Sequence, residues 1–182
     1  MLNFDTISLP NPKPMKKPIV FILLIIAFST VPYKAPARSI QNGALENLLV
    51  YYLQIKNGLV KSQNIQSIAA DFLQSASAIN QQNLSEEERK SWAAYSVNII
   101  KDLEGLAASS DIEKQRKYFA ALSVHFYPLV KTMTIENALY YQYCPMYNNG
   151  KGAYWISELS NIQNPYYGNK MLTCGSTKEA IH

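Results

Sequence analysis

The chain has 182 residues, a hydrophobic content of 48% and a formal net charge of +4. This length suits a single domain, and the hydrophobic content excludes a disordered body. Four of the 17 Lys and Arg residues and one of the 13 Asp and Glu residues precede Arg38, which leaves thirteen basic against twelve acidic residues from Arg38 onward. Nucleic-acid binding needs a concentrated basic face, so we expect no DNA or RNA partner.

Residues 1–37 are expected to be an N-terminal extension and a signal peptide, with Met15 as the true start. Two lysines precede an apolar run at 18–31. A membrane span takes about 20 residues, so this run is more typical of a secretory signal, with an uncleaved anchor as the alternative. Cleavage is predicted after Ala37 in a small-x-small pattern, which would leave a periplasmic protein without a stable membrane span.

Residues 38–182 are expected to form one mainly α domain. Apolar residues recur at helical spacing over 42–61, 64–80, 85–109 and 111–133. The short polar connections between these segments predict an antiparallel four-helix bundle with up-down-up-down topology. In the third segment, Ser85 can form a capping box with the carboxylate three residues later.

The last predicted helix carries His125, which is the only histidine before the terminal one. One histidine on a helix is usually a half-buried packing residue, although imidazole is also a common metal ligand. Met133 continues the apolar stripe of the same helix, so we interpret it as a core residue.

A loop-rich tail is predicted over 138–175. Tyr140–Tyr143 and Ala153–Ser157 favour a short β-hairpin around the Asn- and Gly-rich turn at 148–152. The remainder is expected to be loop with one short helical turn. The tail holds seven of the 13 tyrosines and one of the two tryptophans. Such a segment cannot be stable alone, so we expect it to pack on the bundle with its aromatic rings mainly in the core.

Both cysteines lie in this tail, and each has a methionine nearby: Cys144 with Met146, and Met171 with Cys174. Three interpretations stay open. A Cys144–Cys174 disulfide suits an oxidising compartment. The four sulfurs, with His125 as a fifth ligand, suit a soft ion such as copper(I) or silver. The third interpretation is two buried, inert thiols.

Four motifs of the tail, YYQYCPM, NGKGAYWIS, NPYYG and MLTCG, resemble the C-terminal signature of domain-of-unknown-function family 3347. This resemblance implies an exported bacterial helical domain, similar to domains attached to adaptor subunits of copper and silver efflux systems. It points to Cys144, Met146, Met171 and Cys174 as metal ligands, together with the segment that holds His125.

We therefore expect a non-enzymatic periplasmic metal chaperone or efflux accessory that binds copper(I) or silver. Its partners would be the metal ion and an efflux adaptor or another periplasmic protein. The alternative is a structural or protein-binding module whose tail is pinned by a Cys144–Cys174 disulfide. A third hypothesis is glycan binding by exposed aromatic rings of the tail, namely Tyr154, Trp155, Tyr166 and Tyr167. An enzyme is the least supported class, because no catalytic triad or phosphate-binding loop is present.

Overall fold

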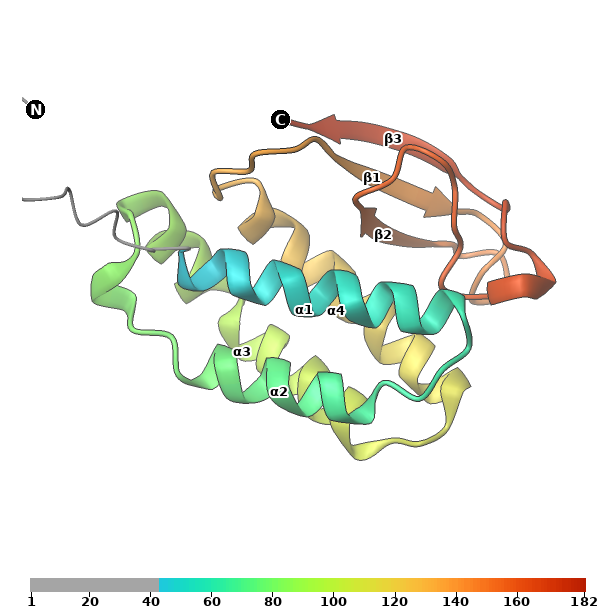
Figure 1. The fold of residues 1–182 in the computed structure, drawn as a ribbon, viewed down its shortest axis with the longest axis horizontal. Helices are drawn as coiled ribbons and strands as arrows, with labels where there is room; N and C mark the ends of the chain where they lie inside the picture. Colours follow the sequence, from blue (N-terminus) through green and yellow to red (C-terminus); the bar gives the residue numbers. More distant parts are fainter. Residues whose placement is uncertain (1–42) are drawn as a thin grey trace, which may run out of the picture. The chain divides into compact units, whose positions relative to one another are not determined.

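The computed structural model describes residues 43–182, so the predictions for the extension, the signal peptide and its cleavage lie outside the described residues. Four helices come first in the described part (Figure 1). They are α1 (Ala44–Val60), α2 (Gln66–Ser77), α3 (Glu86–Ala108) and α4 (Ile112–Val130), with a 3₁₀ turn, η1 (Gln81–Asn83), between α2 and α3. The predicted four-helix arrangement is confirmed, with bounds that differ by a few residues.

Local sequence signals explain where two of the helices begin. Ser85 accepts a hydrogen bond from the Glu88 amide, and the Glu88 carboxylate accepts one from the Ser85 amide, which is the capping box predicted for α3. Asp111 accepts from the amides of Glu113 and Lys114 at the start of α4.

The C-terminal end of α4 was predicted a few residues too late. The helix ends at Val130, two residues after a proline that has no amide to donate.

The helices bury their apolar stripes against one another. The core residues of α1 recur every three or four positions, as one helical face requires, and all are fully buried: Leu45, Leu48, Tyr52, Ile55 and Leu59. Met133, beyond the end of α4, is 8% exposed, which confirms it as a core residue.

The tail forms a three-stranded antiparallel sheet of β1 (Leu139–Cys144), β2 (Ala153–Ser157) and β3 (Ser176–Ile181), in the order β2-β1-β3. The predicted β1–β2 hairpin is confirmed, with Tyr143 opposite Tyr154. The third strand was not predicted. Its sequence, STKEAI, is mostly exposed and has two charged residues, so it lacks the apolar pattern by which strands are recognised. Edge strands often carry such residues.

The sheet lies against the bundle through β2, which packs on α4 and α1. The Ile156 amide of β2 donates to the Tyr52 hydroxyl at 3.0 Å, and that hydroxyl also lies 2.7 Å from Ser123 Oγ of α4. Tyr127 of α4 stacks on Tyr141 of β1, with ring centroids 3.8 Å apart. The tail is thus packed on the bundle, as predicted.

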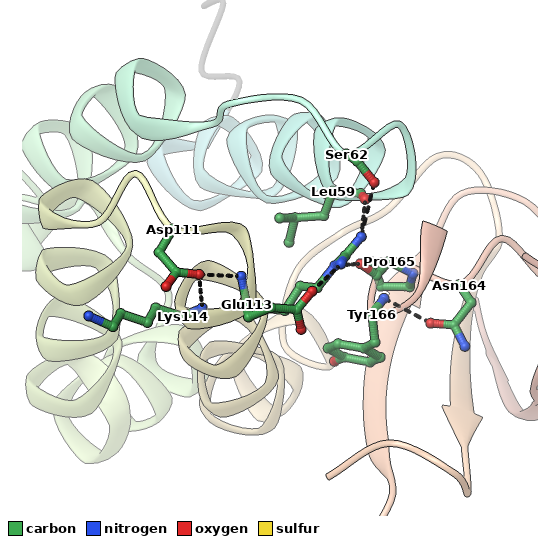
Figure 2. A network of polar contacts seen from close by, with 9 residues as sticks. Leu59, Ser62, Asp111, Glu113, Lys114, Asn164, Pro165 and Tyr166 are labelled. Carbon is green, nitrogen blue, oxygen red and sulfur yellow. Dashed lines mark hydrogen bonds and ion pairs between the residues drawn. The ribbon is translucent and has the colours of Figure 1, made fainter. Parts of the chain in front are cut away.

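Arg116 of α4 fastens the loop after β2 to the end of α1, in the network that Figure 2 shows. Its side chain is almost fully buried. Nε donates to the Pro165 carbonyl at 3.0 Å, while Nη2 donates to Ser62 Oγ at 3.1 Å and to the Leu59 carbonyl at 3.4 Å. Nη1 pairs with the Glu113 carboxylate at 2.7 Å. One guanidinium therefore holds three segments at the same end of the bundle.

Candidate thiol site

The fold brings the two cysteines into contact. Cys144 is the last residue of β1, and Cys174 lies two residues before β3. The pairing of Tyr143 with Ser176 places the two thiols side by side where the strands end. Their Sγ atoms are 3.1 Å apart, and both thiols are free. Cys144 is fully buried and Cys174 is half-buried, so solvent reaches the pair from the Cys174 side.

Gly175 makes this close approach feasible. Its φ of +146° is one that residues with a side chain rarely adopt. A Cβ at this position would lie 2.9 Å from the Trp155 ring and 2.9 Å from the Tyr143 carbonyl oxygen. The glycine therefore lets the strand that follows Cys174 lie flat against β1.

The pKa of the Cys174 thiol is raised. The largest cause is the hydrogen bond shared with Cys144, which stabilises the protonated form, and burial and the nearby Cys144 charge add to it. The backbone amide of Met146 acts in the opposite direction. At neutral pH, Cys174 is therefore a protonated thiol rather than a reactive thiolate.

The backbone carbonyls of both predicted methionines accept hydrogen bonds, that of Met171 from Cys174 and that of Met146 from Tyr167. The Tyr167 hydroxyl donates to the Met146 carbonyl at 3.0 Å, and the Cys174 amide donates to the Met171 carbonyl at 3.1 Å. The Met146 side chain is exposed and that of Met171 is half-buried. The two methionines thus lie on the segments that carry the thiols. The Met146 side chain is exposed, so no packing fixes its rotamer.

His125 has a different partner. Its Nδ1 lies 2.7 Å from Asp102 Oδ2, so the imidazole links α4 to α3. Burial raises the pKa of Asp102, and the hydrogen bond from His125 opposes that change. Of the five predicted ligands, the structure therefore brings the side chains of Cys144 and Cys174 into contact and engages His125 in an interhelical pair.

A chain of aromatic rings adjoins the thiol pair. Tyr167 contacts Tyr147, with centroids 6.0 Å apart, Tyr147 stacks on Tyr166 at 4.4 Å, and Tyr166 meets Trp155 edge-on at 5.8 Å. The cysteine charges help to raise the pKa of Tyr167, although burial is the larger cause. Because Gln142 is opposite Trp155 and Cys144 opposite Ala153, the indole lies on the same face of the sheet as Cys144.

The burial of two of its four rings counts against the glycan hypothesis, which required exposed aromatics, and the other two, Tyr154 and Tyr167, are half-buried. Trp155 is 0% exposed and Tyr166 is 1% exposed. Both rings are core residues between the sheet and the loop that covers it, as the core-packing interpretation of the tail predicted. The member of the site that the sequence did not predict is Gly175, because its role depends on the pairing of β3 with β1. Tyr167 was named only as a ring of the glycan hypothesis.

Two properties of residues 43–182 bear on the classes of function. In this part of the chain, no three or more His, Cys, Asp or Glu side chains gather as a metal-binding group. A metal site here would therefore rest on the two thiols and the thioethers. None of the helices described is long and apolar enough to cross a membrane.

One family of known sequences matches most of the helical part of the chain and the segment that leads to β1. The sequence model of the family described as "Protein of unknown function (DUF3347)" matches residues 48–138. The chain belongs to this family. The match confirms the family that the tail motifs suggested. It ends before β1, so the two cysteines of this DUF3347 protein lie outside the matched residues. No curated protein and no solved structure matches the chain.

Proposed function

We propose that this DUF3347 protein is an exported, non-enzymatic carrier of copper(I) or silver, acting as a periplasmic chaperone or efflux accessory. Cys144 and Cys174 would hold the ion, with thioethers from Met171 and Met146 completing its sulfur shell. The observation that supports the proposal is the 3.1 Å contact between two free thiols from segments thirty residues apart. His125 is left out of the proposed site because its Nδ1 contacts Asp102.

The chemistry of the donors favours a soft monovalent ion. Thiolates and thioethers select copper(I), whereas structural zinc sites use four Cys, His or carboxylate ligands. In the described residues only two such side chains come together at this point. The raised pKa of Cys174 does not prevent binding, because a metal ion displaces the thiol protons as it binds.

The same contact favours the second candidate, a structural module stapled by a Cys144–Cys174 disulfide. That bond would close a loop of thirty residues. In the chain-entropy model, the stabilisation is about 3–4 kcal/mol. The two candidates need opposite redox states of one pair, so the state of the thiols decides between them.

The test is copper(I) competition against a chromogenic chelator, with the freshly reduced chain under anaerobic conditions. We expect one ion per chain and complete loss of binding in the Cys144→Ser/Cys174→Ser variant. Met171→Leu should weaken binding about ten-fold or more, since one soft ligand is lost. Met133→Leu is the matched control, because this buried methionine lies in the core and its replacement should leave affinity unchanged.

Mass spectrometry of material isolated without reductant completes the test. A mass that starts at Arg38 with two free thiols supports the exported carrier. A quantitative internal disulfide, together with no copper(I) binding after reduction, would sink the carrier proposal in favour of the stapled module.

A further inference from the structure

The thiol pair is already close to the geometry of a covalent bond. Its sulfurs are 3.1 Å apart, whereas the S–S bond of a disulfide is about 2.05 Å long. The sulfurs must therefore approach by roughly 1 Å. The two cysteines lie just beyond the terminal residue pair of the β1–β3 ladder, which is Tyr143 with Ser176. The thiols can thus join without breaking the strand pairing.

The surroundings select the kind of oxidant. The half-buried Cys174 is the thiol that an oxidant meets first, since Cys144 is fully buried. Access from the Cys174 side alone favours a small oxidant over the disulfide of another protein, whose sulfurs would have to reach into this site. A thiophilic metal ion is small enough, and once bound to sulfur it can accept an electron through the new metal–sulfur bond.

We infer that the Cys144–Cys174 pair reduces copper(II) to copper(I) and is itself oxidised to a disulfide. The inference rests on the same thiols as the proposed function and adds a redox activity to them. Two copper(II) ions accept one electron each. Two S–H bonds break, one S–S bond forms, and two protons pass to solvent. One chain can either reduce copper(II) or hold copper(I) at any moment, because both use the same pair.

The test mixes the fully reduced, full-length chain with copper(II) sulfate under anaerobic conditions, in the presence of a copper(I)-specific chelator. We expect two copper(I) ions per chain, loss of both free thiols and a chain lighter by two hydrogen atoms. Because the second thiol is already in place, the rate per chain should not depend on chain concentration. It should exceed that of glutathione at equal thiol concentration by at least about ten-fold.

Two controls separate the folded pair from ordinary thiols. The wild-type chain unfolded in guanidinium keeps both cysteines but loses their contact, and it should react about ten-fold more slowly or worse. The Cys144→Ser variant should lose the fast reaction and form only disulfides between chains. Equal rates for folded and unfolded chains, or chain-to-chain disulfides in the wild type, would overturn the inference.

A silver titration keeps this inference distinct from the proposed function. Silver(I) binds thiolates without oxidising them, so it probes the site alone. Silver binding without copper(II) reduction would refute the redox activity and leave the carrier in place. Copper(II) reduction by a chain that holds neither silver nor copper(I) would support the redox activity and refute the carrier.

Discussion

Tyr52 shows how one side chain can hold two layers together. Its ring packs between Phe119 and Phe126 of α4, with centroids 5.0 and 5.2 Å away, and its buried hydroxyl accepts from the Ile156 amide of β2. Burial raises the pKa of this phenol well above its ordinary value. The hydroxyl therefore stays neutral at any physiological pH and acts as a fixed polar contact between helix and sheet.

Replacing Tyr52 with Phe should lower the free energy of unfolding by about 1–3 kcal/mol, because the buried Ile156 amide loses its acceptor. Urea denaturation measures the change. Ser123→Ala is the companion variant. It should lower the free energy of unfolding by less, because the Tyr52 hydroxyl still accepts from the Ile156 amide when Ser123 Oγ is removed. A loss below about 0.5 kcal/mol for Tyr52→Phe would mean that water replaces the hydroxyl.

Arg116→Lys should destabilise the fold by about 2–4 kcal/mol even though the charge is kept. A lysine ammonium cannot reach the Pro165 and Leu59 carbonyls from one position as the guanidinium fork does. Thermal unfolding is the measurement. The control is Arg89→Lys, at an exposed position on α3, which should leave the melting temperature unchanged. A similar small shift in both variants would contradict the role given to Arg116.

At the level of elements, the sequence predicted what local patterns encode. The helices follow from apolar spacing, and the start of α3 from Ser85 and Glu88. The strand β3 was not predicted because its apolar content is low, so the contact of the thiols stayed one of several open interpretations. Cys144 and Cys174 meet only because β3 pairs with β1, and no spacing within either segment contains that information. The contact between His125 and Asp102 likewise depends on how α4 packs against α3, which neither segment's sequence encodes by itself.

The join between α1 and the end of β2 contains a buried ion pair that should give the fold a pH dependence. Lys56 is fully buried, and its Nζ lies 2.9 Å from Glu158 Oε2, while Asn57 donates to Oε1 of the same carboxylate. The pKa of Glu158 is lowered: burial, the largest effect, raises it, but the bonds from Lys56 and Asn57 together outweigh burial. A carboxylate with a lowered folded pKa stabilises the fold above its unfolded pKa, and this stabilisation is lost as the pH falls through the folded pKa.

Glu158→Gln should therefore cost about 1–3 kcal/mol at pH 7, a value reduced for the partial exposure of the carboxylate. The cost should shrink as the pH falls through the lowered pKa of Glu158, because the wild-type carboxyl then also becomes neutral. Chemical denaturation at a series of pH values checks this. Glu86→Gln, whose ion pair with Lys90 is exposed, serves as the control and should show almost no effect. A pH-independent cost for Glu158→Gln would refute the charge argument.

On the scale of the whole molecule, the DUF3347 match and the thiol pair occupy different layers. The family model covers residues 48–138, from within α1 to the residue before β1, and the thiols belong to the sheet. The bundle is thus the scaffold on which the sheet is mounted, with Tyr52 and Arg116 as two of its attachments.

A ligand that binds only the folded pair should stabilise the whole fold. At one hundred times its dissociation constant, silver should raise the free energy of unfolding by about 2.7 kcal/mol. Thermal unfolding of the reduced chain with and without silver measures this shift. The double serine variant should show none, and an equal shift in that variant would place the silver elsewhere.

The burial of Trp155 in the sheet has a spectroscopic consequence. The second tryptophan of the chain, Trp92, is buried in α3, so each layer carries one intrinsic fluorophore. Trp92→Phe leaves an emission signal from the sheet alone, and Trp155→Phe leaves one from the helices alone. Coincident unfolding curves would make scaffold and sheet a single cooperative unit. An earlier transition at Trp155 would show that the thiol-bearing layer opens first, while the bundle beneath it stays folded.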